Sequence, residues 1–329
     1  MPKIKEFHLF AGIGGGIYGG KLLGHTCCAG VEIDKYCKSV LRQRQEDGWM
    51  EHFPIYDDIT VLNGEQFKGK FDILCGGFPC QAFSQAAHGN NKEEKNLWPD
   101  MFRFVQESEA PIVFGENVTR EAIEMACNDL LSIGYEVQYC KLACEYLGAD
   151  HLRPRYWLVA IRNRDKVFTK VAKHLQKMEK LQANCWLESP RNIVYPAPIP
   201  AQAPQLKAVG NAQSPFAAAT AFRLLFNRHL NPQKYKVIPK SEEIEAVFNK
   251  QSTWIKNNYG VDCIVHTPTT MGNYHYASMQ KHPVCRNYVM VFGKPNCVDA
   301  EYLMGFPIGA SSAYPCPQNN IEVWNVRNL

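Results

Sequence analysis

A cysteine in a loop shaped by glycine and proline is the residue of this sequence best suited to covalent chemistry. Cys80 stands in the segment GGFPCQ (76–81), directly after the apolar run 71–75. A lone cysteine is more often an inert core residue, but a thiol on such a loop is exposed. It becomes a nucleophile where nearby cations or dipoles stabilise its thiolate. The loop context therefore favours a reactive thiol at Cys80.

A glycine-rich loop, FAGIGGG (10–16), follows the first strand-like run. Glycines let the backbone turn tightly and approach a ligand closely. Glu32 lies twenty residues after Gly12, where an acid can accept hydrogen bonds from the ribose hydroxyls of an adenosine-containing ligand. Residue 17 is isoleucine, where the dinucleotide fingerprint requires a third glycine. This pattern favours a nucleoside ligand over a nicotinamide cofactor; a plain tight turn is the alternative.

Two further acids follow strand-like runs. Asp58 comes after a short third run and could accept a hydrogen bond from an adenine amino group, with Ile33 and Ile59 as apolar walls. Glu116 ends the run 111–115 and is a candidate acid or hydrogen-bond donor. The alternative for each is a structural role, as a turn or a helix cap.

Two arginines, Arg153 and Arg155, flank Pro154 ahead of the run 156–161. Side chains two apart on an extended chain point to the same side, so the pair could grip a phosphate or a base carbonyl; a pair of surface arginines is the alternative. Gly210-Asn211 precedes a helical stretch, where such a pair is ordinarily a turn.

Strand-like and helix-like segments alternate from residue 5 to about 165. This alternation predicts an α/β fold with a doubly wound, mostly parallel sheet, which binds ligands beyond the carboxyl ends of its strands. The predicted strands are 6–10, 26–32, 71–75, 111–115, 135–141 and 156–161, and the predicted helices are 35–46, 100–108 and 121–133.

The remainder divides into a connector, a helix and a second unit. Lysines spaced through 165–187 indicate a helix with a solvated face, and a basic face for nucleic acid is the alternative. The proline-rich stretch 189–204 indicates an extended chain. A helix is expected at 215–230. We expect a catalytic and cofactor-binding domain at 1–231, with its connector at about 165–204, and a smaller domain at 232–329.

Composition excludes several classes of protein. A hydrophobic content of 46% is too high for a disordered chain. No apolar run approaches the about 18 residues of a membrane span, and the N-terminus lacks the features of a signal peptide. The 13 cysteines include no CxxC pair, so we expect reduced thiols, no metal site and a cytoplasmic location. The net charge of +4 is compatible with nucleic-acid binding but does not argue for it.

Taken together and in this order, these residues resemble the DNA (cytosine-5) methyltransferase family, over roughly 5–160 and 205–228. The resemblance implies a Rossmann-like fold, S-adenosylmethionine as cofactor and double-stranded DNA as partner. Cys80, Glu116, Arg153 and Arg155 match its catalytic motifs. The positions that match its cofactor-binding residues are Phe10, Ala11, Gly12, Ile13, Gly14, Gly15, Glu32, Ile33, Asp58, Ile59, Pro79, Leu97, Asn211 and Ala212.

The order of the last blocks departs from the usual family pattern. The segment EYLMGFP (301–307) is similar to one that normally precedes the Gly-Asn block, but here it follows Gly210-Asn211. This arrangement resembles that of some bacteriophage-type members. Target recognition is then expected in about 232–300, around HTPT (266–269). His151 stands where the family usually has glutamine. A cognate restriction endonuclease is a further possible partner.

The resemblance implies that the Cys80 thiolate adds to C6 of a flipped-out cytosine while Glu116 hydrogen-bonds to N3, so that C5 attacks the donor's methyl group. Loss of the C5 proton and release of Cys80 from C6 then complete the reaction. Residues 85–97 are expected to form a loop that closes over the site. An RNA cytosine-5 methyltransferase and a catalytically silent DNA-binding homologue are the alternatives. An NAD-dependent oxidoreductase is disfavoured by Ile17.

Overall fold

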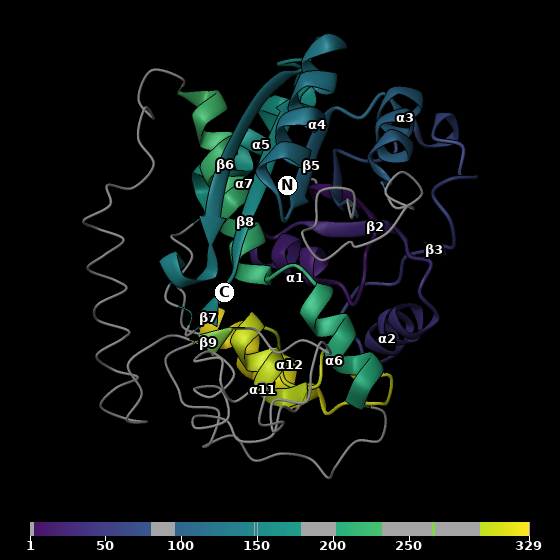
Figure 1. Cartoon of the computed structure of the whole chain (residues 1–329), viewed down its shortest axis with the longest axis vertical. Coiled ribbons are helices and arrows are strands. Elements are labelled where there is room, and N and C mark those ends of the chain that lie inside the picture. Colours follow the sequence, from purple (N-terminus) through teal and green to yellow (C-terminus); the bar gives the residue numbers. More distant parts are fainter. Residues whose placement is uncertain are drawn as a thin grey trace.

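A seven-stranded sheet forms the centre of the protein in a computed structural model (Figure 1). The structure describes residues 3–79, 96–147, 149, 151–178, 202–231, 265–266 and 297–328. Strand order is β3-β2-β1-β4-β5-β8-β6, and β8 alone runs against the others. The strands are β1 (Lys5–Leu9), β2 (Thr26–Val31), β3 (Ile55–Tyr56), β4 (Ile73–Gly77), β5 (Ile112–Asn117), β6 (Glu136–Ala143) and β8 (Pro154–Ile161).

The predicted fold class is confirmed, and each predicted strand lies within two residues of an observed one. The central strands are buried along nearly their whole length, as in β5, where every residue is buried. A strand covered by helices on both faces reads as a continuous apolar run, which is why these runs were visible in the sequence.

Helices cover both faces of the sheet, and several begin at a capping side chain. Asp34 accepts a hydrogen bond from Cys37 N at the start of α2, and Asp165 accepts two at the start of α5. The helices are α1 (Gly15–Leu22), α2 (Lys35–Glu46), α3 (Trp98–Ser108), α4 (Arg120–Ser132), α5 (Lys166–Lys177), α6 (Gln202–Asn211), α7 (Pro215–Leu230), α11 (Cys297–Met304) and α12 (Gln318–Asn328). None of the helices in these ranges is long and apolar enough to cross a membrane.

The stretch predicted as a connector contains the helix α5 and the first residues of α6. α5 buries Phe168, which stacks on Phe226 of α7 at 5.2 Å, while Lys166 and Lys173 stay exposed, as expected of a solvated face. The prediction of an extended chain through residue 204 is wrong at its end, because α6 begins at Gln202. Pro204 does not prevent this, since proline is tolerated in the first turn of a helix.

The C-terminal segment 297–328 packs against the first part of the chain. Tyr18 of α1 makes edge-to-face contacts with Phe306 and Trp324, and Tyr36 of α2 donates a hydrogen bond to Ser311 O. These residues belong to the same hydrophobic core as α1, α2 and α7. A separate domain therefore stays a prediction for 232–296 alone, of which only 265–266 lies within the described residues.

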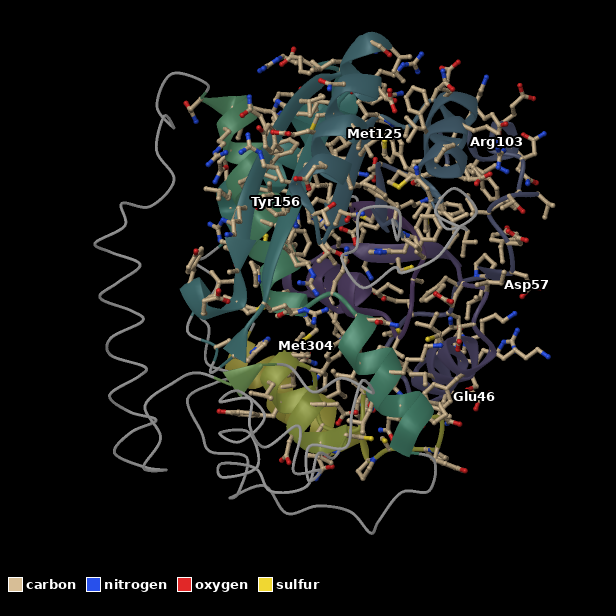
Figure 2. All side chains as sticks on the ribbon, in the orientation of Figure 1. Glu46, Asp57, Arg103, Met125, Tyr156 and Met304 are labelled. Carbon is tan, nitrogen blue, oxygen red and sulfur yellow. The ribbon has the colours of Figure 1, made fainter. Side chains whose placement is uncertain are left out.

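The two sequence blocks with reversed order lie side by side. α6, which ends at Asn211, contacts α11, which ends at Met304 just before the Gly-Phe-Pro segment (Figures 1 and 2). Val265–His266 (β9) pairs in parallel with His151–Leu152 (β7). This part of the predicted recognition region therefore lies beside the strand that immediately precedes Arg153. The rearranged order is thus compatible with a single packed unit.

Candidate active site

A cavity of about 590 Å³ opens at the carboxyl ends of the parallel strands. It lies where the chain order reverses: β1 is flanked by β2 on one side and by β4 on the other. Open α/β sheets bind ligands at such a switch point because the loops after neighbouring strands diverge there. Loops after β1, β2, β3 and β4, together with α6, supply the walls.

The glycine-rich loop after β1 forms one wall and is tied to the end of β2. Glu32 Oε2 accepts a hydrogen bond from Gly12 N at 2.6 Å, and its Oε1 accepts one from Asp34 N at 2.8 Å. Phe10 has a φ of 53°, in the left-handed region that non-glycine residues rarely adopt. Burial raises the pKa of the Glu32 carboxyl, although the N–H groups of Asp34 and Gly12 act in the opposite direction.

A second wall is apolar with an acidic rim. Ile33 is 68% exposed and Ile59 is buried, and both line the cavity with Asp57 and Asp58. Asp58 Oδ1 accepts hydrogen bonds from the Thr60 backbone N–H and hydroxyl, each at 2.9 Å, so the turn expected as the alternative role is present. Asp57 pairs with Lys38.

The predicted nucleophile, Cys80, and residues 81–95 lie outside the described residues, as does most of the predicted closing loop. The flanking residues are described, and they meet: Leu97 N donates to Pro79 O at 3.1 Å, and both residues line the cavity. Asn117, buried at the end of β5, donates from Nδ2 to Phe78 O at 2.8 Å. The sequence Glu-Asn-Val therefore contributes a second contact that we did not predict, holding the chain two residues before Cys80.

Glu116 lines the same cavity and is held by two side chains. Arg155 Nε lies 3.2 Å from its Oε1, and Gln213 Nε2 donates to its Oε2 at 3.4 Å. The Glu116 and Arg155 side chains are 11% and 18% exposed. Neither is a surface residue, so the surface-arginine alternative does not describe Arg155.

Arg153 has a different environment from Arg155. Its guanidinium is buried and donates from Nη2 to Gly210 O at 3.1 Å and to Ala212 O at 2.6 Å. Burial, followed by repulsion from Arg155, lowers the pKa of Arg153 to about 9. Arg153 thus connects β8 to the Gly-Asn segment rather than facing solvent.

The structure brings most of the predicted cofactor-binding residues to this one cavity. Ile13 and Gly14 do not line it: Ile13 is fully buried, and Gly14 is the N-cap of α1. Twelve predicted residues do, namely Phe10, Ala11, Gly12, Gly15, Glu32, Ile33, Asp58, Ile59, Pro79, Leu97, Asn211 and Ala212.

Several lining residues were not predicted, and those on α6 carried a recognisable signal. The unpredicted residues are Pro204, Lys207 and Ala208, and together with the predicted Asn211 they follow the i, i+3, i+4, i+7 spacing of one helix face. That spacing was missed because the stretch before 205 was interpreted as extended. The other unpredicted lining residues are His8, Leu9, Gly16, Val31, Asp34, Tyr36, Cys37, Asp57, Gly76, Gly77 and Gln213.

A buried polar cluster lies behind the glycine loop. Glu6 accepts hydrogen bonds from His8 Nε2 at 2.9 Å and His25 Nδ1 at 2.6 Å, if each nitrogen carries the proton. Burial alone would raise the pKa of Glu6, but the charge and hydrogen bonds of His25 and His8 outweigh it and lower the pKa to about 2. Glu6, His8 and Cys75 are spaced closely enough to hold a metal ion, but the histidines already satisfy the carboxylate.

The chain is similar in sequence to several type II methyltransferases. Type II methyltransferase M.HgiBI of Herpetosiphon aurantiacus is 31% identical over 173 residues, which cover 50% of this chain and 38% of that protein. M.CviJI of Paramecium bursaria Chlorella virus IL3A is 29% identical and M.HhaI of Haemophilus parahaemolyticus 31%. These matches cover 48% and 50% of this chain, and 43% and 50% of those proteins. The chain thus spans half or less of the length of these relatives.

The family model described as C-5 cytosine-specific DNA methylase matches residues 4–282, which is most of the chain. The matched range includes the glycine loop, Glu32, the segment around Pro79, Glu116, the two arginines and the Gly-Asn segment. The chain therefore belongs to the C-5 cytosine-specific DNA methylase family.

Proposed function

We propose that this protein transfers a methyl group from S-adenosylmethionine to C5 of cytosine in double-stranded DNA. The observation that carries the proposal is that Glu116, paired with Arg155, lines the same cavity as Glu32 and as Pro79, the residue before Cys80. One cavity thus holds the acid proposed to bind ribose beside groups proposed to act on a base.

The cavity residues fit the proposed cofactor. The volume of about 590 Å³ is typical of a small-molecule site. Each Glu32 oxygen accepts one backbone N–H, which leaves lone pairs for two ribose hydroxyls. Ile33 and Ile59 would pack against the adenine ring, with Asp58 near its amino group, and α6 would close the opposite wall through Asn211 and Ala212. When bound, S-adenosylmethionine supplies an electrophilic methyl group.

The chain's own residues would supply the activation of cytosine. The C5 carbon is a poor nucleophile until a thiolate adds to C6, and Cys80 is the proposed nucleophile. Glu116 would hold a hydrogen bond or a proton at N3 while charge develops on the ring. These atoms are hidden in a duplex, so the target base must be flipped out, at a cost of a few kcal/mol.

Arg155 and Arg153 would act on this centre in different ways. Arg155 orients the Glu116 carboxyl through Nε and keeps other donor groups for the base carbonyl or a flanking phosphate. Arg153 would hold the Gly210–Ala212 segment against the cavity, because both of its carbonyl partners belong to that segment. We place target recognition in 232–296, and β9 joins this region to β7.

The test is transfer of labelled methyl groups from S-adenosylmethionine to unmethylated duplex DNA, with Cys80→Ala and Glu116→Gln as variants. We expect label at C5 of cytosine, loss of label in Cys80→Ala and a rate at least about 100-fold lower in Glu116→Gln. Label on transfer RNA but not on DNA would support the RNA alternative. DNA binding without any transfer by the unmodified protein would support the silent homologue, and either result would refute the proposal.

A further inference from the structure

Gln213 occupies a space that three glycines leave open next to the cavity. It lies between α6, which ends at Asn211, and α7, which begins at Pro215. A Cβ atom on Gly15 would lie 2.1 Å from the Gln213 carbonyl oxygen, and one on Gly16 would lie 2.6 Å from its Oε1. One on Gly77 would lie 3.0 Å from its Nε2. Gly15 therefore leaves room for the Gln213 backbone, and Gly16 and Gly77 leave room for its side chain.

The amide of Gln213 reaches the carboxyl group proposed to act on the base. Gln213 Nε2 donates to Glu116 Oε2 at 3.4 Å, while Arg155 Nε lies 3.2 Å from Glu116 Oε1. The two contacts come from the α6–α7 turn and from β8, so both carboxyl oxygens are held by separate parts of the fold. A bond of this length in a protein without its ligands can tighten when substrate binds.

The chemical difference between these two partners carries the inference. A guanidinium donates hydrogen bonds but cannot accept them. Arg155 can therefore hold Glu116 only through a carboxyl oxygen that carries no proton. A primary amide has both a donor and an acceptor. By turning over, the Gln213 amide can donate to the ionised carboxylate or accept from the protonated carboxylic acid.

We propose that Gln213 is a positioning residue that keeps the Glu116 carboxyl aimed at the target base in both of its protonation states. The inference rests on the proposed function, because it assumes that Glu116 acts on cytosine. It adds a role for the Gly-Asn segment: Arg153 fixes the carbonyls of Gly210 and Ala212, and the next residue, Gln213, contacts Glu116. The segment thereby joins the cofactor wall to the catalytic carboxyl.

The test is a double-mutant cycle between Gln213→Met and Glu116→Gln, measured as the single-turnover rate of methyl transfer. Methionine keeps the side-chain length and removes both hydrogen-bonding atoms. We expect Gln213→Met to lower the rate about 10- to 100-fold through misplacement of Glu116, with KM for DNA and Kd for S-adenosylmethionine within about threefold of the parent protein. In the Glu116→Gln background the same change should cost less than about twofold.

Gln213→Asn is the second variant, in case the methionine variant fails to fold, and it should lose activity because its amide is one methylene too short. Gln176→Met, on the exposed face of α5, is the matched control. A fully active Gln213→Met protein would overturn the inference. The inference would also be overturned if Gln213→Met lowered the rate by the same factor in the parent and in the Glu116→Gln protein, because that is the effect of a merely structural residue. Absence of transfer by the unmodified protein would overturn the proposed function and this inference together, whereas the other two outcomes concern Gln213 alone.

Discussion

Single residues in the cavity walls do two tasks at once. Glu32 uses one oxygen for Gly12 N and the other for Asp34 N, so its carboxylate shapes the glycine loop as well as facing the cavity. Glu116 is likewise shared between Arg155 and Gln213. Because a carboxylate offers acceptors on both oxygens and an amide on only one, substitutions that preserve size need not preserve these contacts.

Glu32→Gln should weaken S-adenosylmethionine binding about tenfold or more, since a hydrogen bond to a charged group contributes about 1.5–3 kcal/mol. The glutamine NH₂ would also face a backbone N–H of Gly12 or Asp34, so donor would oppose donor. Calorimetric titration with the cofactor measures the change. Glu46→Gln is the control, because Glu46 is exposed on α2 (Figure 2). Equal affinities for parent and Glu32→Gln proteins would contradict this role of Glu32.

Gly77→Ala should slow methyl transfer while leaving cofactor binding nearly intact. The added Cβ would lie 2.9 Å from Glu116 Oε2 and 3.0 Å from Gln213 Nε2. One of these groups must therefore move, and a displacement of this kind lowers the rate about 10-fold or more. Gly30→Ala on β2 is the control, because its Cβ would come no closer than 3.4 Å to another group. The Gly77→Ala and Gly30→Ala variants are compared by their single-turnover rates of methyl transfer. Equal rates would exclude the expected crowding at Gly77.

At the scale of elements, the sheet supplies the positions of the proposed catalytic groups, and a buried polar cluster joins β1 to the residue before β2. Glu6 on β1 bonds to His8 on the same strand and to His25 just before β2. Behind the glycine loop, this cluster lies within a region that is otherwise strongly apolar. A buried ionised carboxylate is costly unless it is paired, so the cluster stabilises the fold only while Glu6 is ionised and its partners donate to it.

The pKa of Glu6 predicts how this contribution changes with pH. The carboxyl has a pKa of about 2 in the folded protein and an ordinary value of 4.5. The unfolded chain therefore binds more protons between these values, and the stabilisation is present above about pH 4.5 and is lost as the pH falls toward 2. Glu6→Gln should reduce the free energy of unfolding by a few kcal/mol at pH 7 and by less near pH 3.

Urea unfolding of both proteins at several pH values measures this difference. Glu124→Gln is the control, since its exposed pair with Arg120 should contribute little at any pH. A Glu6→Gln difference that stays constant from pH 7 to pH 3 would show that the loss of stability comes from packing and not from the ionised pair.

At the scale of the whole molecule, the C-terminal segment completes the core that begins at the N-terminus. Arg44 of α2 is fully buried and donates to the carbonyl oxygens of Gly309 and Tyr314. Glu301 accepts hydrogen bonds from Gly309 N and Ser311 N, each at 2.7 Å. The Arg44 contacts hold residues 309–314 against α2, whereas the Glu301 contacts join α11 to residues 309–311, and α11 lies against α6.

Trp324→Ala tests whether this segment and the seven-stranded sheet with its helices unfold together. Trp324 is buried against Tyr18, and truncation of a buried tryptophan costs about 3–5 kcal/mol. We expect a single unfolding transition that moves as a whole to lower temperature in calorimetry. Tyr314→Ala is the control, because this side chain is 51% exposed. A separate early transition, with the main one unchanged, would mean that the segment folds independently.

The sequence by itself determined the fold class and about half of the cavity's lining residues. Fully buried strands must be apolar along their length, and the residues that follow them, such as Gly12 after β1 and Glu116 at the end of β5, meet at one edge of a parallel sheet. Local rules therefore sufficed to predict that Glu32, Asp58 and Glu116 would share a cavity. They could not settle the roles of these side chains, which the experiments above address.

Only the tertiary structure decided which distant groups meet. Arg153 and Arg155 are neighbours in sequence and were predicted to act as a pair, yet one turns to the carbonyls of Gly210 and Ala212 and the other to Glu116. Gln213 gave no signal, because its contact with Glu116 depends on where α7 places the turn before it. The reversed order of the last sequence blocks was visible, but their adjacency was not, since the packing of α11 on α6 depends on a hydrophobic core assembled from both ends of the chain.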